Sequence, residues 1–157
     1  MNNFEVKAGL VEVDEFDVVG ISIITDNSKG TDDINAIWER FFKDSIGLSI
    51  TDKVNDNIYA VYSDYEGDHE APYRLTIGYR VKGDHTPDGM TRITIIDQSY
   101  AVMSAVGQQP KALIETWQAI WSADDLGRTF KTDFELYGPR FFEDGVNEVL
   151  VHVGIAA

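Results

Sequence analysis

The feature that most restricts the fold of this chain is an internal duplication. Residues 57–82 and 131–155 each read as a strand of alternating apolar side chains, then a turn, then a second strand. Each copy follows two strand-like segments and one amphipathic helix, so the duplication extends beyond these residues. The sequence therefore predicts a single domain, residues 1–157, built from two pseudo-symmetric halves at about 1–86 and 87–157.

Each half is expected to contain strand, strand, helix, strand and strand, in that order. Apolar alternation and β-branched residues predict the strands, and apolar residues at i, i+3, i+4 and i+7 predict the helices. The first helix is expected to open at Thr31 and to stop near Gly47, and the second to begin at Pro110. The expected strands span residues 4–13, 17–25, 57–64, 73–82, 91–96, 100–106, 130–137 and 147–155.

This order of elements predicts an α+β fold with antiparallel pairing. Short turns between alternating strands favour an antiparallel sheet, with each helix laid across one face. We expect a ligand groove between the two halves. Along the strand at 130–137, the alternation suggests a helix-facing set and an opposite set of Lys131, Asp133, Glu135 and Tyr137. The expected helix-facing residues are Phe130, Thr132, Phe134 and Leu136.

The composition narrows the possible partners. The 157 residues are 43% hydrophobic, enough for a packed core, and 27 acidic against 13 basic residues give a net charge of −14. Such a surface repels phosphate backbones, so we expect no direct nucleic-acid binding. The N-terminus lacks a signal-peptide pattern, and no apolar stretch approaches the roughly 18–20 residues of a membrane helix. We therefore expect a soluble, cytoplasmic protein without a membrane partner.

Motifs for common cofactors and catalytic groups are missing. The chain has no cysteine, which excludes disulfides, thiolate chemistry and cysteine-bound zinc. It also lacks a phosphate-binding glycine loop, a nucleophile elbow and a His-Glu-x-x-His pair, so we expect no cofactor and no metal. The acidic turn around His69 does not have the spacing of a calcium loop and is interpreted as a solvated hairpin tip.

The mismatch between the two copies suggests a binding site. Tyr62 aligns with Tyr137, but Ala60 aligns with Glu135. A glutamate on a polar strand face is often merely solvated. If Glu135 is instead buried among aromatic rings, its pKa would rise, and a bound cation would restore the ionised form. Each ring face over that cation would contribute about 0.5–2 kcal/mol. The candidate ligand-binding residues are Glu135, Tyr137, Tyr62, Trp117 and Trp38.

Five segments carry a family resemblance in the order Gly20–Ser22, Ile37–Phe42, Tyr59–Glu66, Ile114–Trp121 and Thr132–Tyr137. Together they make the chain resemble the GyrI-like family, the effector-binding domain of AraC- and MerR-type transcription regulators. Its freestanding integron-cassette members are the most similar. The resemblance implies two pseudo-symmetric halves with a ligand pocket between them. It also implies binding of lipophilic cations, such as dyes and drugs, through a glutamate in the penultimate strand, which by motif is Glu135.

Three functions stay open, and we favour the first, which is not enzymatic. It is a binding protein for lipophilic or aromatic organic cations, with Glu135 as the counter-charge in an aromatic pocket. The second is a small hydrolase of electrophilic compounds in which Glu135 is the general base and Tyr137 or Tyr62 donates a proton, although Ala60 occupies the place of a second acid. The third is an acidic protein-interaction module, similar to gyrase inhibitors, that mimics DNA.

Regulators of the resembled family also carry a helix-turn-helix or winged-helix domain, and the sequence shows no such segment. The chain is therefore expected to act as a lone binding protein, or as a sensor with a DNA-binding or other protein partner.

Overall fold

The structure is a computed structural model that describes residues 9–26, 30–67, 71–109, 111–122, 126–143 and 146–156. Three expected features lie outside these residues. They are the part of the first strand before residue 9, the start of the second helix at Pro110, and the tip of the acidic turn at His69.

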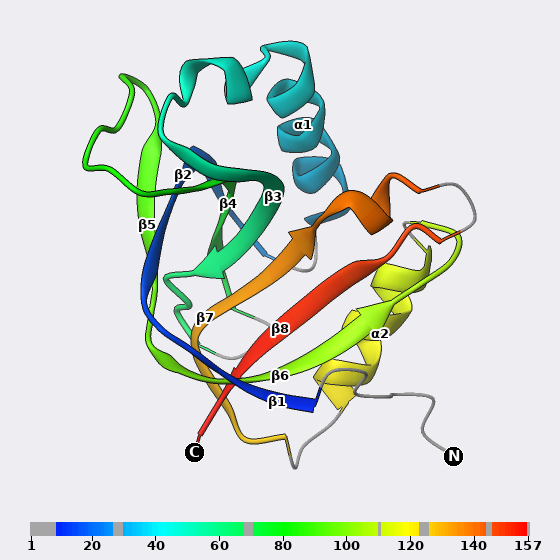
Figure 1. Cartoon of the computed structure of the whole chain (residues 1–157). Helices are drawn as coiled ribbons and strands as arrows, with labels where there is room; N and C mark the ends of the chain where they lie inside the picture. The colour runs from blue at the N-terminus through cyan, green and yellow to red at the C-terminus, as the bar shows by residue number, and fades with distance from the viewer. Residues whose placement is uncertain are drawn as a thin grey trace.

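Within the described residues, each predicted strand and helix is found (Figure 1). The helices are α1 (Gly30–Lys43) and α2 (Lys111–Ser122), and two short 3-10 helices are η1 (Ile46–Ser49) and η2 (Pro139–Phe141). The strands are β1 (Gly9–Val13), β2 (Phe16–Thr25), β3 (Lys53–Ser63), β4 (Tyr73–Val81), β5 (Thr91–Ile95), β6 (Gln98–Ala105), β7 (Arg128–Tyr137) and β8 (Val149–Ile155).

The first helix ends earlier than Gly47, the stop expected from the sequence. It ends at Lys43, and Ser45 follows with a φ of 49°, in the left-handed region that a helix cannot continue through. Asp32 and Asp33 lie in its first turn, where their negative charges interact favourably with the positive end of the helix dipole. Residues 46–49 then form the 3-10 turn that leads into β3.

The strands form one antiparallel sheet in the order β1-β6-β8-β7-β3-β4-β2-β5. This order is symmetric about the β7–β3 seam if β1, β2, β3 and β4 are equated with β5, β6, β7 and β8. The symmetry includes an exchange. Strand β1 pairs with β6 of the second half, and β5 pairs with β2 of the first half. Each half thus supplies the outermost strand of the other.

The seam between the halves is the β3–β7 ladder, and its centre is the mismatched pair from the sequence alignment. Ala60 is the direct partner of Glu135, so the two aligned positions also face each other across the pseudo-twofold axis. The irregularities of the two strands are symmetric as well. The register shifts between Lys53 and Ile58 in the β3–β4 ladder, and between Arg128 and Asp133 in the β7–β8 ladder.

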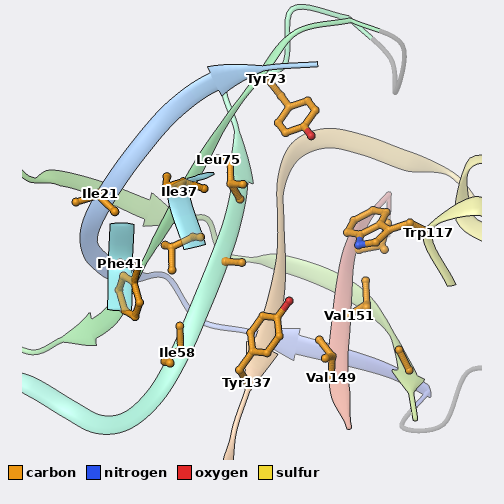
Figure 2. Packing of buried hydrophobic residues seen from close by; sticks show 14 of the residues in the cluster. Ile21, Ile37, Phe41, Ile58, Tyr73, Leu75, Trp117, Tyr137, Val149 and Val151 are labelled. Atoms are coloured by element: carbon orange, nitrogen blue, oxygen red, sulfur yellow. The ribbon is translucent and has the colours of Figure 1, made fainter. Parts of the chain in front are cut away.

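Both faces of the sheet are buried near the seam, and this corrects the expected orientation of β7. The larger apolar cluster includes residues of both helices, Trp117 of α2 and Phe41 of α1, and it also includes Ala60 and Tyr137 (Figure 2). The face that carries Glu135 and Tyr137 is therefore the helix face, and the prediction was inverted. Three of the residues predicted to face the helix lie on the opposite face. Phe134 and Leu136 pack in the second cluster, and Thr132 hydrogen-bonds to Tyr100 of that cluster.

The inversion has a physical reason. Strand alternation separates two faces but does not say which one a helix covers when both are apolar. The second cluster is also aromatic near the seam, where Phe134 contacts the rings of Tyr59 and Tyr100. Phe130, the fourth residue of the predicted set, lies within the irregular segment between Arg128 and Asp133, has a φ of 54° and packs edge-on against Tyr65.

A glycine pair lets two strands of the first half approach each other closely. Gly20 of β2 and Gly78 of β4 are direct partners, and a Cβ atom at Gly20 would lie only 1.9 Å from the carbonyl oxygen of Ile77. Only glycine permits so close an approach of two backbones. In the second half the equivalent pair is Val102 and His152, so the two halves do not share this contact.

Candidate ligand-binding site

Glu135 is a buried acid held by three neutral donors. Its exposed fraction is 2%, and none of the ion pairs among the described residues includes it. Tyr62 donates a hydrogen bond to Oε2 at 2.7 Å, and Trp117 Nε1 donates to the same oxygen at 2.7 Å. Tyr137 donates to Oε1 at 2.6 Å. Both carboxylate oxygens are therefore hydrogen-bonded, which is the condition for burying so polar a group.

Strand geometry and the helix position together explain how these donors converge. Tyr137 lies two residues after Glu135, so both side chains project from the same face of β7. Tyr62 reaches Glu135 from β3, where it lies two residues beyond Ala60, the cross-strand partner of Glu135. Trp117 comes from α2, whose buried face packs over this part of the sheet. Ala60 adds only a methyl group and leaves the carboxylate the space between the tyrosines.

Burial dominates the electrostatics of the site. It raises the pKa of Glu135, and the hydrogen bonds from Tyr137, Tyr62 and Trp117 oppose this rise. Burial and the neighbouring Glu135 carboxylate hold the pKa of Tyr62 and of Tyr137 well above the usual value, so both phenols stay protonated as donors. Tyr73, whose ring lies 5.4 Å from that of Tyr62, has its pKa raised to about 12 by burial and then by Glu135.

The two tryptophans predicted as walls occupy equivalent but unequal positions. Trp117 packs on Tyr62, with ring centroids 5.1 Å apart, and Trp38 packs edge-on against Tyr137 at 4.9 Å. Each tryptophan thus supports one of the two tyrosines that hold Glu135. Trp117 also donates a hydrogen bond to the carboxylate, whereas Trp38 stacks on Phe42 in its own helix. Four of the predicted residues therefore form one hydrogen-bonded group, and Trp38 contacts it only through Tyr137.

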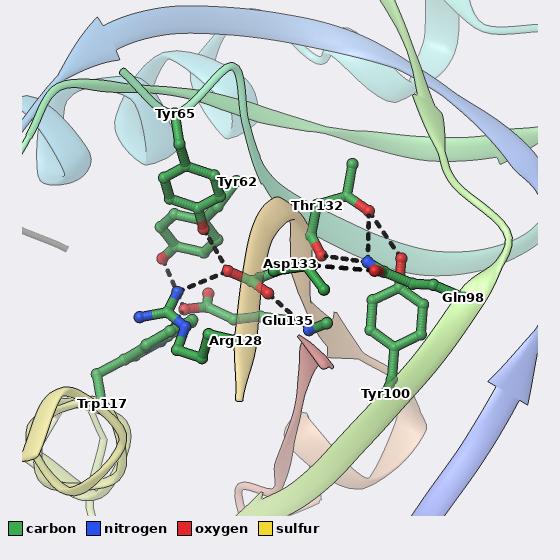
Figure 3. Close-up of polar contacts among 11 residues, drawn as sticks. Tyr62, Tyr65, Gln98, Tyr100, Trp117, Arg128, Thr132, Asp133 and Glu135 are labelled. Atoms are coloured by element: carbon green, nitrogen blue, oxygen red, sulfur yellow. Dashed lines mark hydrogen bonds and ion pairs between the residues drawn. The ribbon is translucent and has the colours of Figure 1, made fainter. Parts of the chain in front are cut away.

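A second buried polar group adjoins the first, and sequence reasoning did not single it out (Figure 3). Asp133 is fully buried and accepts hydrogen bonds from Arg128 Nη2 at 2.7 Å and from the backbone N–H of Gly154 at 2.7 Å. Tyr65 also donates to Asp133. The alignment of the two copies contained a signal for this group. Asp133 aligns with Ile58, so a carboxylate stands where the other copy has an apolar residue.

Two other kinds of feature are absent from the described part of the chain. Among these residues, no group of three or more His, Asp or Glu side chains is arranged to hold a metal ion. None of the described helices has the length and apolar character needed to cross a membrane.

The sequence pattern of a known family matches almost the entire described chain. This family is described as "Integron-associated effector binding protein", and its match covers residues 9–152. The chain belongs to this family. The GyrI-like resemblance inferred from the sequence is thereby confirmed, and solved structures of similar fold support the predicted α+β architecture.

Two curated relatives of this effector-binding protein are named as transcriptional regulators. YobU of Bacillus subtilis, a putative transcriptional regulator protein, is 32% identical over 108 residues, which are 66% of this chain and 68% of YobU. The transcriptional regulator BrlR of Pseudomonas aeruginosa is 31% identical over 140 residues, which are 85% of this chain. The chain spans only 49% of the length of BrlR.

Two solved structures share the fold at low sequence identity. The integron cassette protein VCH_CASS2 of Vibrio cholerae is 21% identical, with a TM-score of 0.73 and coverage of 95% of this chain and 97% of the other. SAV2435, solved bound to tetraphenylphosphonium, is 17% identical, with a TM-score of 0.79 and coverage of 94% and 93%. At these identities the likeness concerns the fold alone.

Proposed function

We propose that this effector-binding protein binds lipophilic organic cations, with Glu135 as the counter-charge and aromatic side chains as the walls. The observation that carries the proposal is the burial of Glu135 among neutral donors, without a described cationic partner. Removing a carboxylate from water raises its energy, and an organic cation beside it would recover much of that energy. The fold of SAV2435, a protein solved with tetraphenylphosphonium, supports the same class of ligand.

The aromatic shell explains a preference for lipophilic cations. Tyr62, Tyr137 and Trp117 surround the carboxylate, and their rings are much poorer hydrogen-bond partners than water for a small hydrated cation such as ammonium. Ring faces attract a positive charge spread over an apolar ion at about 0.5–2 kcal/mol each. Because Glu135 is only 2% exposed, a ligand reaches it after at least one of these side chains turns aside. Binding should therefore be accompanied by a change in tryptophan fluorescence.

The same geometry gives less support to general-base hydrolysis. A general base needs a carboxylate oxygen within hydrogen-bond reach of the water that it activates. Here Oε1 accepts a bond from Tyr137, and Oε2 accepts two, from Tyr62 and Trp117. These bonds hold the carboxylate as an acceptor for donors and cations.

The direct test is calorimetric titration with tetraphenylphosphonium of the wild type and of Glu135→Gln. We expect wild-type binding in the micromolar range, about −8 kcal/mol, and at least a ~10-fold loss in the variant. Glu12→Gln is the matched control, because Glu12 is an exposed acid of β1 and its removal reduces the net negative charge by the same amount. Equal affinity of wild type and Glu135→Gln would remove this carboxylate from the site. An equal loss in both variants would indicate attraction by overall charge.

A further inference from the structure

We infer that Arg128 forms a second subsite beside Glu135, one that donates hydrogen bonds to an oxygen acceptor of the ligand. The inference rests on the proposed function and narrows its ligand class. The preferred ligand would be an organic cation that also carries a carboxylate or carbonyl group, in place of a purely hydrocarbon cation.

The first observation is that Arg128 is buried with donors to spare. Its side chain is 7% exposed, and one nitrogen, Nη2, is 2.7 Å from Asp133, which is fully buried. The Nε and Nη1 atoms are also buried, and no residue that the structure describes accepts a hydrogen bond from them. A guanidinium has five N–H donors, and leaving buried donors unpaired is costly, so such atoms call for an explanation.

The second observation is the position of the guanidinium. Its Cζ atom lies 5.9 Å from the ring of Trp117, the same indole that donates to Glu135 at 2.7 Å. Figure 3 shows the guanidinium between Trp117 and Asp133, beside the Glu135 carboxylate. Asp133 and Glu135 lie two residues apart on the helix face of β7. A single ligand of ordinary size can therefore contact both the carboxylate of Glu135 and the donors of Arg128.

Charge decides the kind of group that fits. Asp133 already balances the positive charge of Arg128, so a second cation there would meet a guanidinium and no free carboxylate. An acceptor oxygen would instead meet unpaired N–H groups in an apolar setting, where charge-assisted hydrogen bonds are strong. The rings of Phe130, 4.2 Å from Cζ, and Trp117 confine the guanidinium and limit its alternatives.

A comparison within the molecule shows that the unpaired donors are unusual here. Arg92 forms an ion pair of the same length, 2.7 Å, with Asp17, but each of its three nitrogens has an acceptor. In the first half, the position equivalent to Arg128 is Lys53, which lies near Asp56 at 3.9 Å and over the ring of Tyr79. The repeated fold therefore does not require a buried guanidinium at this bulge.

The test compares two phosphonium ions of equal chain length by calorimetry. Pentyltriphenylphosphonium is a plain cation, and (4-carboxybutyl)triphenylphosphonium adds a carboxylate. We expect the wild type to prefer the carboxylated ion by about 10-fold, the usual effect of a hydrogen bond to a charged group. In Arg128→Lys this ratio should fall to about 1, because an ammonium paired with Asp133 has no guanidinium nitrogens to offer. Arg92→Lys is the matched control and should keep the wild-type ratio.

Each outcome decides something different. An unchanged ratio in Arg128→Lys, with both ions bound, would overturn the Arg128 subsite and leave the cation-binding function intact. Failure of the wild type to bind either ion would overturn both proposals. If Arg128→Lys does not fold, the double variant Arg128→Met/Asp133→Ile, which removes both buried charges, takes its place, and the same ratio decides. Circular dichroism spectra of all variants verify folding.

Discussion

Around the seam, the two halves of the molecule place equivalent side chains in unequal roles. Tyr62 and Tyr137 are equivalent, and both donate to Glu135, one to each oxygen. Ala60 and Glu135 are equivalent and directly paired, but only one carries charge. A symmetric scaffold can therefore supply matched donors to a single acid placed near the pseudo-twofold axis.

The same inequality extends along the two seam strands. At the bulges, the second half has Arg128 and Asp133 where the first has Lys53 and Ile58. Arg128 and Asp133 form a buried ion pair, whereas Lys53 lies near Asp56, whose side chain is 98% exposed. Polar atoms have thus been gathered in the second half, on the face that both helices cover. Three changes test whether this inequality matters.

The largest effect is expected when only one member of the buried pair is removed. Arg128→Met leaves Asp133 as an uncompensated carboxylate with no exposed surface, which should cost about 3–5 kcal/mol of unfolding free energy. The double variant Arg128→Met/Asp133→Ile, which copies Ile58 of the first half, should recover most of this loss. Urea unfolding followed by circular dichroism measures both. A loss below about 1 kcal/mol in the single variant would show that the pair is not effectively buried in solution.

A second change makes the two halves more alike at the axis. In Ala60→Glu the new carboxylate faces Glu135 across directly paired positions, where Cβ atoms are about 4.5–5.5 Å apart. Two acids so close cannot both ionise, so we expect a loss of about 2–4 kcal/mol at pH 7 and a smaller loss at pH 4.

Moving the acid from one half to the other sharpens this test. In Ala60→Glu/Glu135→Ala, the tyrosine donors remain, and the roles of Trp38 and Trp117 should be exchanged. We expect this variant to be more stable than Glu135→Ala, which leaves Tyr62, Tyr137 and Trp117 without their acceptor. Thermal unfolding of the two variants makes the comparison. Equal stability would mean that the pseudo-symmetry does not extend to the hydrogen-bonding geometry.

The smallest of the three effects concerns His152, whose equivalent in the first half is Gly78. The imidazole stacks on Phe134 at 4.2 Å, and burial lowers its pKa to about 4. The unfolded state then binds the proton more readily than the folded state between about pH 6.5 and pH 4. The folded state therefore has its full stability with respect to His152 above about pH 6.5, and it loses stability as pH falls toward 4.

We therefore expect the wild type to lose about 2 kcal/mol more than His152→Phe between pH 7 and pH 4. Phenylalanine keeps a ring beside Phe134 but does not titrate. Glu135, whose pKa is raised, has the opposite sign and loses stability as pH rises, but it contributes equally to both proteins and cancels in the difference. Parallel pH dependence of the two unfolding free energies would contradict the lowered pKa of His152.

Much of the hydrogen-bonded group around Glu135 could be predicted by comparing the sequence with itself. The mismatch of Ala60 and Glu135 marked the residue at the centre of this group, and the alignment of Tyr62 with Tyr137 named two residues that donate to it. The part that failed was the assignment of the two faces of β7. Phe134 and Leu136 were assigned to the helix face but pack in the second cluster, because β7 is buried on both sides.

Arg128 shows a different reason for missing a residue. A charged side chain at the start of a strand is ordinarily solvated, and nothing in its neighbours suggests burial. Its burial follows from the bulge before Asp133 and from the packing of Phe130 and Trp117 around the guanidinium. These contacts join residues from α2 and β7, and a pattern within one strand does not contain them.

By itself, the amino-acid order determined the duplicated α+β plan, because strand and helix periodicities are local properties of the chain. It also singled out Glu135 as a candidate, because an acid that breaks an internal repeat is visible without coordinates. Only the tertiary structure decided that β1 and β5 exchange halves, which face the helices cover, and which donors hold the carboxylate. Those outcomes depend on contacts between distant segments, and the free energy of such contacts is set only when the whole core is assembled.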